Sequence, residues 1–285
     1  MIRVDRALPD RDGAENLAAL EARALPAMRA IVAQHGRDPT QEEIERFDYR
    51  IAGTLLCRRQ GLKCAYCEHP EQRKRNDVEH FRPKTRAQRG PSHPQTHGYW
   101  WLAWRWDNLL FACRNCNQSQ PNQGGKLDKF PLAPTSGVLV AEQDPYGAHA
   151  ALELPTLIDP ARLSGVEHIE YKRLTLPGGA TRWFPVARHM SLLGDTTIRV
   201  CGLDRDDLLD AYDDHVETLV RPRAAQFDDL HPHTAPAERQ RLWAQIEADL
   251  YRPGRPFVGL SYDALCTLVD DDDLAAFGIV RRKPR

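Results

Sequence analysis

Hydrophobic positions recur with helical spacing at the start of the chain and predict two helices there. An amphipathic stretch runs from Leu17 to Val32 and is stopped by Gly36. Thr40–Glu43 then matches a capping box, in which the side chains of the first and fourth residues bond to each other's backbone N–H groups. Apolar residues follow it at helical spacing, namely Ile44, Phe47, Ile51 and Leu55. The second helix is therefore expected to run from residue 41 to about residue 55.

The pattern changes between residues 61 and 130, where short apolar runs, aromatic residues and cysteines replace the long helical periods. Val78–Phe81 and Leu109–Ala112 are short strand candidates, separated by a polar segment that contains prolines. The residues after Cys113 suit a short helix that ends near Gly124–Gly125. This part is expected to fold as a two-stranded hairpin followed by a helix.

Beyond Pro134 the pattern predicts a mostly helical region with no catalytic signature. Leu152–Ile158 and Ile169–Leu176 are strand candidates, and Pro177–Gly179 is a turn. Residues 205–227 suggest a helix with acidic residues early and basic residues late, which complements the helix dipole. A further helix carries Leu242, Ile246 and Leu250.

These patterns predict an α+β protein with helix in excess. Three segments follow from them: a helical one over residues 1–56, a compact module over residues 57–132, and a mostly helical domain over residues 133–285.

Composition places the 285-residue chain among ordinary globular proteins, with 41% hydrophobic and 28% charged residues. No apolar run approaches the roughly 18–20 residues of a membrane span. The first residues carry charges where a secretory signal needs an apolar core. We therefore expect a soluble protein in the cytoplasm with no membrane contact, where paired cysteines more often bind metal than form disulfides.

The net charge of −1 conceals an uneven distribution. Residues 57–130 hold 14 Lys and Arg against 6 Asp and Glu, whereas the rest of the chain holds 25 against 34. A basic region inside an acidic chain is typical of a protein that binds a polyanion, although such charge runs often only face solvent.

Four of the seven cysteines form two Cys-x-x-Cys pairs, Cys64 with Cys67 and Cys113 with Cys116. Two such pairs can complete a tetrahedral Zn²⁺ site, and a closed site of four thiolates is structural. A redox pair is the competing interpretation, but two pairs flanking one basic insertion favour zinc. The other three cysteines, Cys57, Cys201 and Cys266, have apolar neighbours and are expected to be buried thiols.

Between the pairs lies the run Asp77–Lys84 (Asp-Val-Glu-His-Phe-Arg-Pro-Lys), with Asn108 further along and Asn117 directly after the last paired cysteine. Together with the cysteine pairs and the tryptophan-rich stretch at 99–104, this resembles the HNH endonuclease family. More narrowly it resembles the HNH subunits of bacterial Septu-type and retron-associated anti-phage systems. The strong likeness covers about residues 62–132, and a weaker likeness extends to residues 157–160.

The resemblance implies a hairpin and helix around one divalent cation, and it assigns roles by position. His80 is the implied general base, Glu79 and Asn117 are the implied ligands of Mg²⁺ or Mn²⁺, and Asn108 braces the loop. Neutral histidine can accept a proton from water near neutral pH, and hard oxygens suit such a cation. Arg82 and Lys84 are natural phosphate contacts. Because neighbouring strand side chains point to opposite faces, the strand must end or bulge at Glu79 and His80 for both to serve one site.

The chain departs from the wider family in two respects. A lysine commonly follows the last Cys-Asn closely, and here lysines come only at 126 and 129. The carboxylate ligand is Glu79, where Asp or His is seen more widely, although Glu is normal for the narrower subgroup. The tryptophans at 100, 101, 104 and 106 can stack on bases, but packing of a small core is the favoured interpretation.

The sequence thus predicts a metal-dependent endonuclease that hydrolyses DNA. Two alternatives stay open: cleavage of RNA or tRNA by the same site, and a zinc-stapled nucleic-acid-binding module without catalysis. The chain has no phosphate-binding loop of the Walker type. The resemblance therefore implies a separate ATPase subunit as a partner in a defence complex, with the acidic residues 133–285 as its docking surface.

Overall fold

The computed structural model describes residues 3–4, 11–71, 77–118, 124–230, 233–252 and 254–284, with side chains from residue 16 onward in the first helix. In chain order its helices and strands are α1 Arg11–His35, α2 Gln41–Glu45, the 3-10 helix η1 Tyr49–Ala52, α3 Gly53–Arg59, β1 Asp77–His80, η3 Trp100–Leu102, η4 Trp106–Asn108, β2 Leu109–Ala112, α4 Arg114–Asn117, η5 Gly165–Glu167, β3 Ile169–Thr175, β4 Thr181–Ala187, η6 Arg188–Met190, α5 Leu192–Cys201, α6 Asp206–His215, the π-helical turn η7 Val216–Val220, α7 Arg221–Asp228, α8 Pro236–Tyr251, α9 Val258–Leu268 and α10 Asp271–Ala275.

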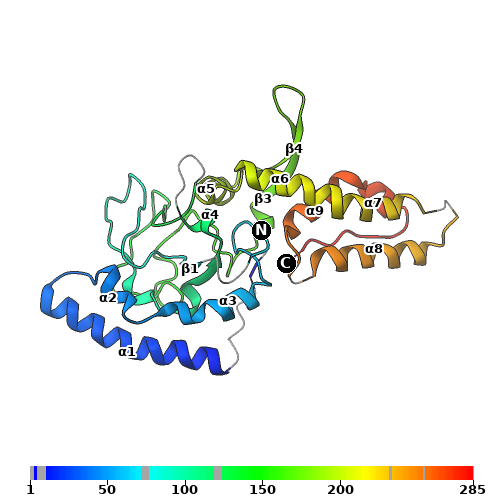
Figure 1. Ribbon diagram of the computed structural model, residues 1–285. Helices are drawn as coiled ribbons and strands as arrows, with labels where there is room; N and C mark the ends of the chain where they lie inside the picture. Colours follow the sequence, from blue (N-terminus) through cyan, green and yellow to red (C-terminus); the bar gives the residue numbers. More distant parts are fainter. Residues whose placement is uncertain are drawn as a thin grey trace.

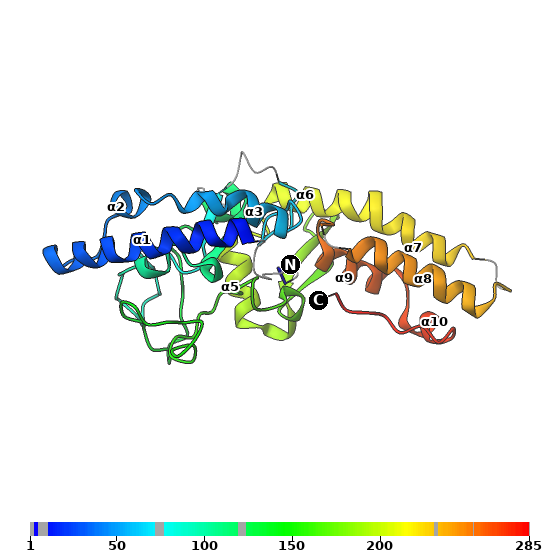
Figure 2. The same ribbon diagram turned by 90° about the horizontal axis from the view of Figure 1, so that it is seen from below.

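The molecule is elongated, with α1 and α2 at one end, a helical bundle at the other, and β1 and α4 between them (Figures 1 and 2). Helices α1–α3 lie along the hairpin of β1 and β2, whereas α6–α9 form the opposite end (Figure 1). The hairpin of β3 and β4 projects from the middle of the molecule (Figure 1). Helices mixed with two small antiparallel sheets confirm the predicted helix-rich α+β class.

The N-terminal helices follow the sequence prediction up to residue 45. The capping box forms, because Thr40 Oγ1 accepts from the Glu43 N–H and the Glu43 carboxylate accepts from the Thr40 N–H. A single helix from residue 41 to 55 was wrong: α2 ends at Glu45, and η1 and α3 follow. The break has a local cause, since the Asp48 carboxylate accepts from the Arg50 N–H and so caps a new helix.

Strands β1 and β2 form the predicted antiparallel pair, with Glu79 opposite Leu110 and His80 opposite Leu109. The first strand starts and ends one residue earlier than predicted, at His80. The side chain of Gln60, just after α3, bonds to both backbone groups of Phe111, so helix α3 is fastened to β2. The predicted helix after Cys113 exists, but it ends at Asn117 and does not reach the glycines.

The second hairpin, formed by β3 and β4, confirms the strand predicted at 169–176. Its partner strand is residues 181–187, and not the predicted strand at 152–158. Residues 169–175 pair with 181–187, and Gly178 and Gly179 turn the chain with φ of 107° and 89°. Residues 152–158 are not a strand; the only pairing described there is one isolated bridge between Leu132 and Pro155.

The C-terminal helices agree with the pattern. Helix α6, the turn η7 and helix α7 continue one another over the predicted 205–227 range, and α8 contains the predicted residues 242–250. No helix among the described residues is long and apolar enough to cross a membrane. Trp100, Trp101 and Trp104 are buried, which confirms their packing role, as are Cys57 and Cys201. Cys266 is exposed, contrary to the prediction, because it lies on the solvent side of α9.

Candidate metal centre and cleft

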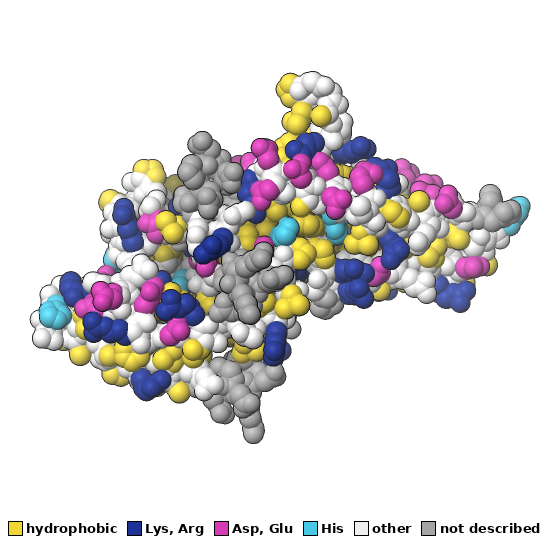
Figure 3. Space-filling model, in the orientation of Figure 1, with side chains coloured by type: hydrophobic (Ala, Val, Ile, Leu, Met, Phe, Trp, Pro, Cys, Tyr) yellow, Lys and Arg dark blue, Asp and Glu magenta, His cyan; other side chains and the backbone are white. Residues whose placement is uncertain are grey.

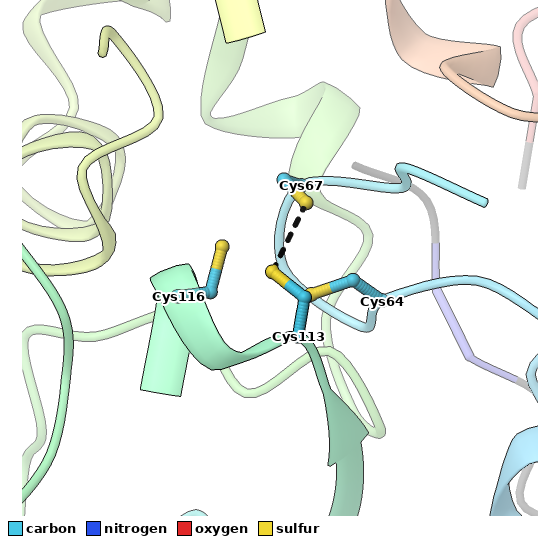
Figure 4. A group of neighbouring side chains, drawn as sticks. All are labelled: Cys64, Cys67, Cys113 and Cys116. Carbon is cyan, nitrogen blue, oxygen red and sulfur yellow. Dashed lines mark hydrogen bonds between the residues drawn. The ribbon is translucent and has the colours of Figure 1, made fainter. Parts of the chain in front are cut away.

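The four paired cysteines converge on one point, as Figure 4 shows. Cys64 and Cys67 come from the loop after α3, Cys113 follows β2, and Cys116 lies in α4 (Figure 4). All four sulfur atoms lie within 4.8 Å of one another, and Cys67 Sγ is 3.8 Å from Cys113 Sγ. Sulfurs about 2.3 Å from a tetrahedral zinc are about 3.8 Å apart. The predicted convergence is therefore confirmed, and the cluster can hold a metal ion such as zinc.

Residues from the C-terminal half surround this cluster. Arg205, just before α6, is 7% exposed, and its Nη1 donates to Cys116 Sγ at 3.5 Å. The buried Lys63 lies next to Cys64, and its ammonium contacts Glu68 at 3.0 Å and the Arg255 carbonyl at 2.8 Å. A cationic guanidinium beside thiolate ligands offsets the negative charge that four thiolates bring to one Zn²⁺. The cluster is thus held between the two halves of the chain.

A cavity of about 700 Å³ opens beside α4 and the end of β1. Three segments line it: the N-terminal residues 41–50, the strand β1 with the loop after it, and the region around α4 and residue 127. Its lining residues are Gln41, Glu45, Tyr49, Arg50, Asp77, Val78, Glu79, His80, Pro83, Lys84, Thr85, Arg86, Asn117, Gln118, Leu127 and Asp128. Four predicted site residues, Glu79, His80, Lys84 and Asn117, therefore share one cleft.

Glu79 is buried in this cleft beside a lysine that the sequence did not place there. The Lys126 ammonium, which is fully buried, lies 2.6 Å from Glu79 Oε1 as an ion pair. Burial raises the pKa of Glu79, and the charge of Lys126 opposes that rise. Among the described residues, the cysteine cluster is the only group of three or more His, Cys, Asp and Glu side chains that converges closely enough to hold a metal.

His80 is 5% exposed, and its imidazole has a defined orientation. Its Nε2 lies 3.0 Å from the Ala103 carbonyl, and the Tyr49 ring packs edge-on at 4.5 Å. Because a carbonyl only accepts hydrogen bonds, Nε2 carries the proton and Nδ1 keeps the lone pair. Burial, together with the charges of Lys84 and Lys126, holds the pKa of His80 well below its usual 6.5. The ring is therefore neutral at neutral pH.

Asn117 is tied to the first residue of β1. Its Nδ2 donates to Asp77 Oδ2 at 2.9 Å, and Gln118 Nε2 donates to the same oxygen at 2.9 Å. Since the amide nitrogen is engaged by Asp77, Oδ1 is the atom of Asn117 that can serve a cation. Asp77 also lines the cleft, and the sequence analysis gave it no role.

Asn108 is fully buried, and its side chain bonds to the loop that follows His80. Its Oδ1 accepts from the Arg82 N–H at 2.8 Å, and its Nδ2 donates to the Arg82 carbonyl at 3.0 Å. The Tyr146 hydroxyl also donates to Asn108 Oδ1 at 3.0 Å. These contacts join the loop after His80 to η4 and to Tyr146.

The two predicted phosphate contacts have different surroundings. Arg82 is 5% exposed, its Nε donates to Glu153 at 3.1 Å, and it does not line the cleft. Its side chain points into the interior because four aromatic rings and a buried carboxylate surround it there. Lys84 does line the cleft, with Nζ 3.7 Å from Glu45 and 5.0 Å from the centre of the Tyr49 ring. Lys84 thus faces the space where a substrate would bind, whereas Arg82 faces the core.

Sequence reasoning missed Lys126 and Tyr49, which both touch His80 or its neighbour Glu79. The sequence did contain a signal for Lys126. The family that the chain resembles commonly has a lysine soon after the last Cys-Asn, and Lys126 is the first lysine after Asn117. No comparable signal marked Tyr49, which comes from a helical segment about 30 residues earlier.

Comparison with known proteins gives one informative similarity. The chain is 35% identical over 138 residues to the Septu protein PtuB of Bacillus mycoides (strain KBAB4), a match that spans 47% of this chain and 42% of that protein. The matched region is thus less than half the length of the relative. No protein-family model matches the sequence, and no solved structure matches it.

Proposed function

We propose that the protein is a divalent-metal-dependent endonuclease of the HNH type that hydrolyses DNA. The observation that carries this proposal is the sharing of one cleft by Glu79, His80 and Asn117, directly beside a four-cysteine cluster. The similarity to a Septu protein supports a role in anti-phage defence.

The chemistry assigns a task to each of these side chains. His80 Nδ1, the lone-pair nitrogen, takes the proton from the attacking water while the Ala103 carbonyl holds the opposite side of the ring. Glu79 and the Asn117 amide oxygen provide the hard oxygen ligands that Mg²⁺ or Mn²⁺ prefers, and the ion when bound stabilises charge on the scissile phosphate. Lys84 contacts a substrate phosphate at the mouth of the cleft. The cysteine cluster, closed by four thiolates, has a structural role.

The proposed complex includes a separate ATPase subunit. Acidic side chains gather along α6 and α7 on the face that Figure 3 shows. Asp206, Asp210 and Asp214 are exposed there. Such a surface is suited to a partner with a basic face, since complementary charge speeds association. Co-purification with an ATPase encoded beside this gene is the expected result, and a chain that never co-purifies with one contradicts the partnership.

Cleavage assays on plasmid DNA, single-stranded DNA and tRNA test the nuclease proposal. The wild type and the His80→Ala variant are compared with Mg²⁺ or Mn²⁺, and with and without the ATPase. Cleavage of DNA that requires the metal and His80 is expected. Cleavage of tRNA alone transfers the assignment to RNA, and metal-independent binding without cleavage under all conditions supports the non-catalytic alternative.

A further inference from the structure

Lys126 contacts both residues that the proposed reaction relies on at the end of β1. Its ammonium lies 2.6 Å from Glu79 Oε1 and donates to the His80 carbonyl at 2.9 Å. The lysine is 0% exposed, so both contacts are shielded from water. Fully buried lysines are uncommon in proteins and are normally kept by specific partners.

These contacts bear on how two consecutive residues of β1 can line one cleft. Glu79 and His80 are consecutive residues, and consecutive side chains of a regular strand point to opposite faces. Both nevertheless line the same cleft, at the point where β1 ends. A single ammonium that binds the Glu79 carboxylate and the His80 backbone carbonyl ties the Glu79 side chain to the backbone at the point where the strand ends.

The segment that carries Lys126 is itself fixed to two other parts of the molecule. The Lys126 N–H donates to the Cys116 carbonyl at 2.8 Å, which joins the segment to the cysteine cluster. The Gly125 N–H donates to the Val200 carbonyl at 2.9 Å, which joins it to the end of α5. Gly124 packs against Gly202 so closely that a side-chain Cβ would lie 2.7 Å from its Cα. These contacts hold the backbone of Lys126 in place.

We infer that Lys126 is a positioning residue that holds Glu79 and His80 in one cleft and transmits the geometry of the cysteine cluster and of α5 to them. The inference rests on the proposed function for its effect on cleavage. Its effect on the end of β1 does not depend on any activity.

The test compares Lys126→Met with Lys126→Arg and with Lys129→Met. Lys129 is a matched control, because its ammonium bonds to the Gly125 carbonyl of the same segment and touches neither Glu79 nor His80 in the described contacts. Three quantities are measured for each variant: the single-turnover cleavage rate, the affinity for uncleaved nucleic acid, and hydrogen exchange at the end of β1. The amides of Phe81 and Arg82 report that end, since both are bonded to Asn108.

We expect Lys126→Met to lower the cleavage rate about 10- to 100-fold, the range typical of groups that orient catalytic side chains. Binding of nucleic acid stays within about twofold, and exchange of the Phe81 and Arg82 amides becomes at least about tenfold faster. Lys126→Arg retains the charge but not both contacts and gives an intermediate loss, while Lys129→Met behaves like the wild type.

Unchanged exchange in Lys126→Met overturns the inference, whether or not the wild type cleaves nucleic acid. It is also overturned if Lys126→Met fails to fold while Lys126→Arg folds and cleaves at the wild-type rate, because Lys126 is then needed only as a buried charge. A wild type that cleaves nothing, combined with accelerated exchange in Lys126→Met alone, rejects the proposed function and retains the structural role of Lys126.

Discussion

The ring of Tyr49 packs edge-on against the imidazole of His80, with 4.5 Å between the ring centres and an angle of 77° between the planes. Tyr49 belongs to η1, which lies outside the stretch that resembles HNH nucleases. The contact therefore makes the N-terminal helices part of the cleft.

Replacing Tyr49 should affect catalysis through the orientation of His80. We expect Tyr49→Ala to lower the cleavage rate about tenfold with little change in substrate affinity, because the imidazole loses one of its two described supports. Tyr49→Phe keeps the ring and should retain wild-type activity. Equal losses in both variants would show that the hydroxyl, and not the ring, is what matters. Rates and KM values for the two variants distinguish these cases.

The pH dependence of cleavage should reflect the low pKa of His80. Burial lowers this pKa well below 6.5, and the base is active when neutral, so activity should persist as pH falls through 6.5 and decline only at lower pH. Lys84 also lowers this pKa, so Lys84→Met should move the decline to higher pH. Rate profiles between about pH 4.5 and 8 for both proteins provide the measurement. An acid limb centred at or above pH 6.5 in the wild type contradicts the argument.

The cysteine cluster should bind one zinc ion per chain and stabilise the fold. Replacing Cys64 or Cys116 by serine removes a thiolate, and structural zinc contributes directly to folding free energy. We expect loss of zinc by elemental analysis and a Tm lower by about 10 °C or more. Cys266→Ser is the control, since this exposed thiol lies outside the cluster and its replacement should leave zinc content and Tm unchanged. Full zinc content in Cys116→Ser would refute the site.

Arg82 and Lys84, two residues apart, should give opposite phenotypes. Arg82→Ala leaves the buried Glu153 without its ion pair and should destabilise the protein by about 3–5 kcal/mol. Lys84→Ala should leave stability nearly unchanged and weaken binding of nucleic acid. The slope of log affinity against log salt concentration should fall by about 0.9 for a duplex, or about 0.7 for a single strand. Denaturant titration and binding at several salt concentrations check both, and an unchanged slope removes Lys84 from the substrate contacts.

Local sequence patterns predicted several of the helices and strands. The capping box at Thr40, the strand before Arg82 and the helix after Cys113 depend on short-range propensities, and all three exist. The spacing of the cysteine pairs predicted one cluster correctly, because two Cys-x-x-Cys pairs can together supply the four thiolates of a tetrahedral metal site.

The identity of the side chains around the cleft was decided by tertiary structure. Arg82 was predicted to face a phosphate, but Glu153 and a set of aromatic rings, distant in sequence, offer it a buried place. Tyr49 reaches the cleft because η1 packs against β1, and Lys126 reaches Glu79 because its segment is bonded to α4 and to the end of α5. Residue type and spacing determine which groups are available to a site, whereas burial and partners from remote segments determine where each side chain points.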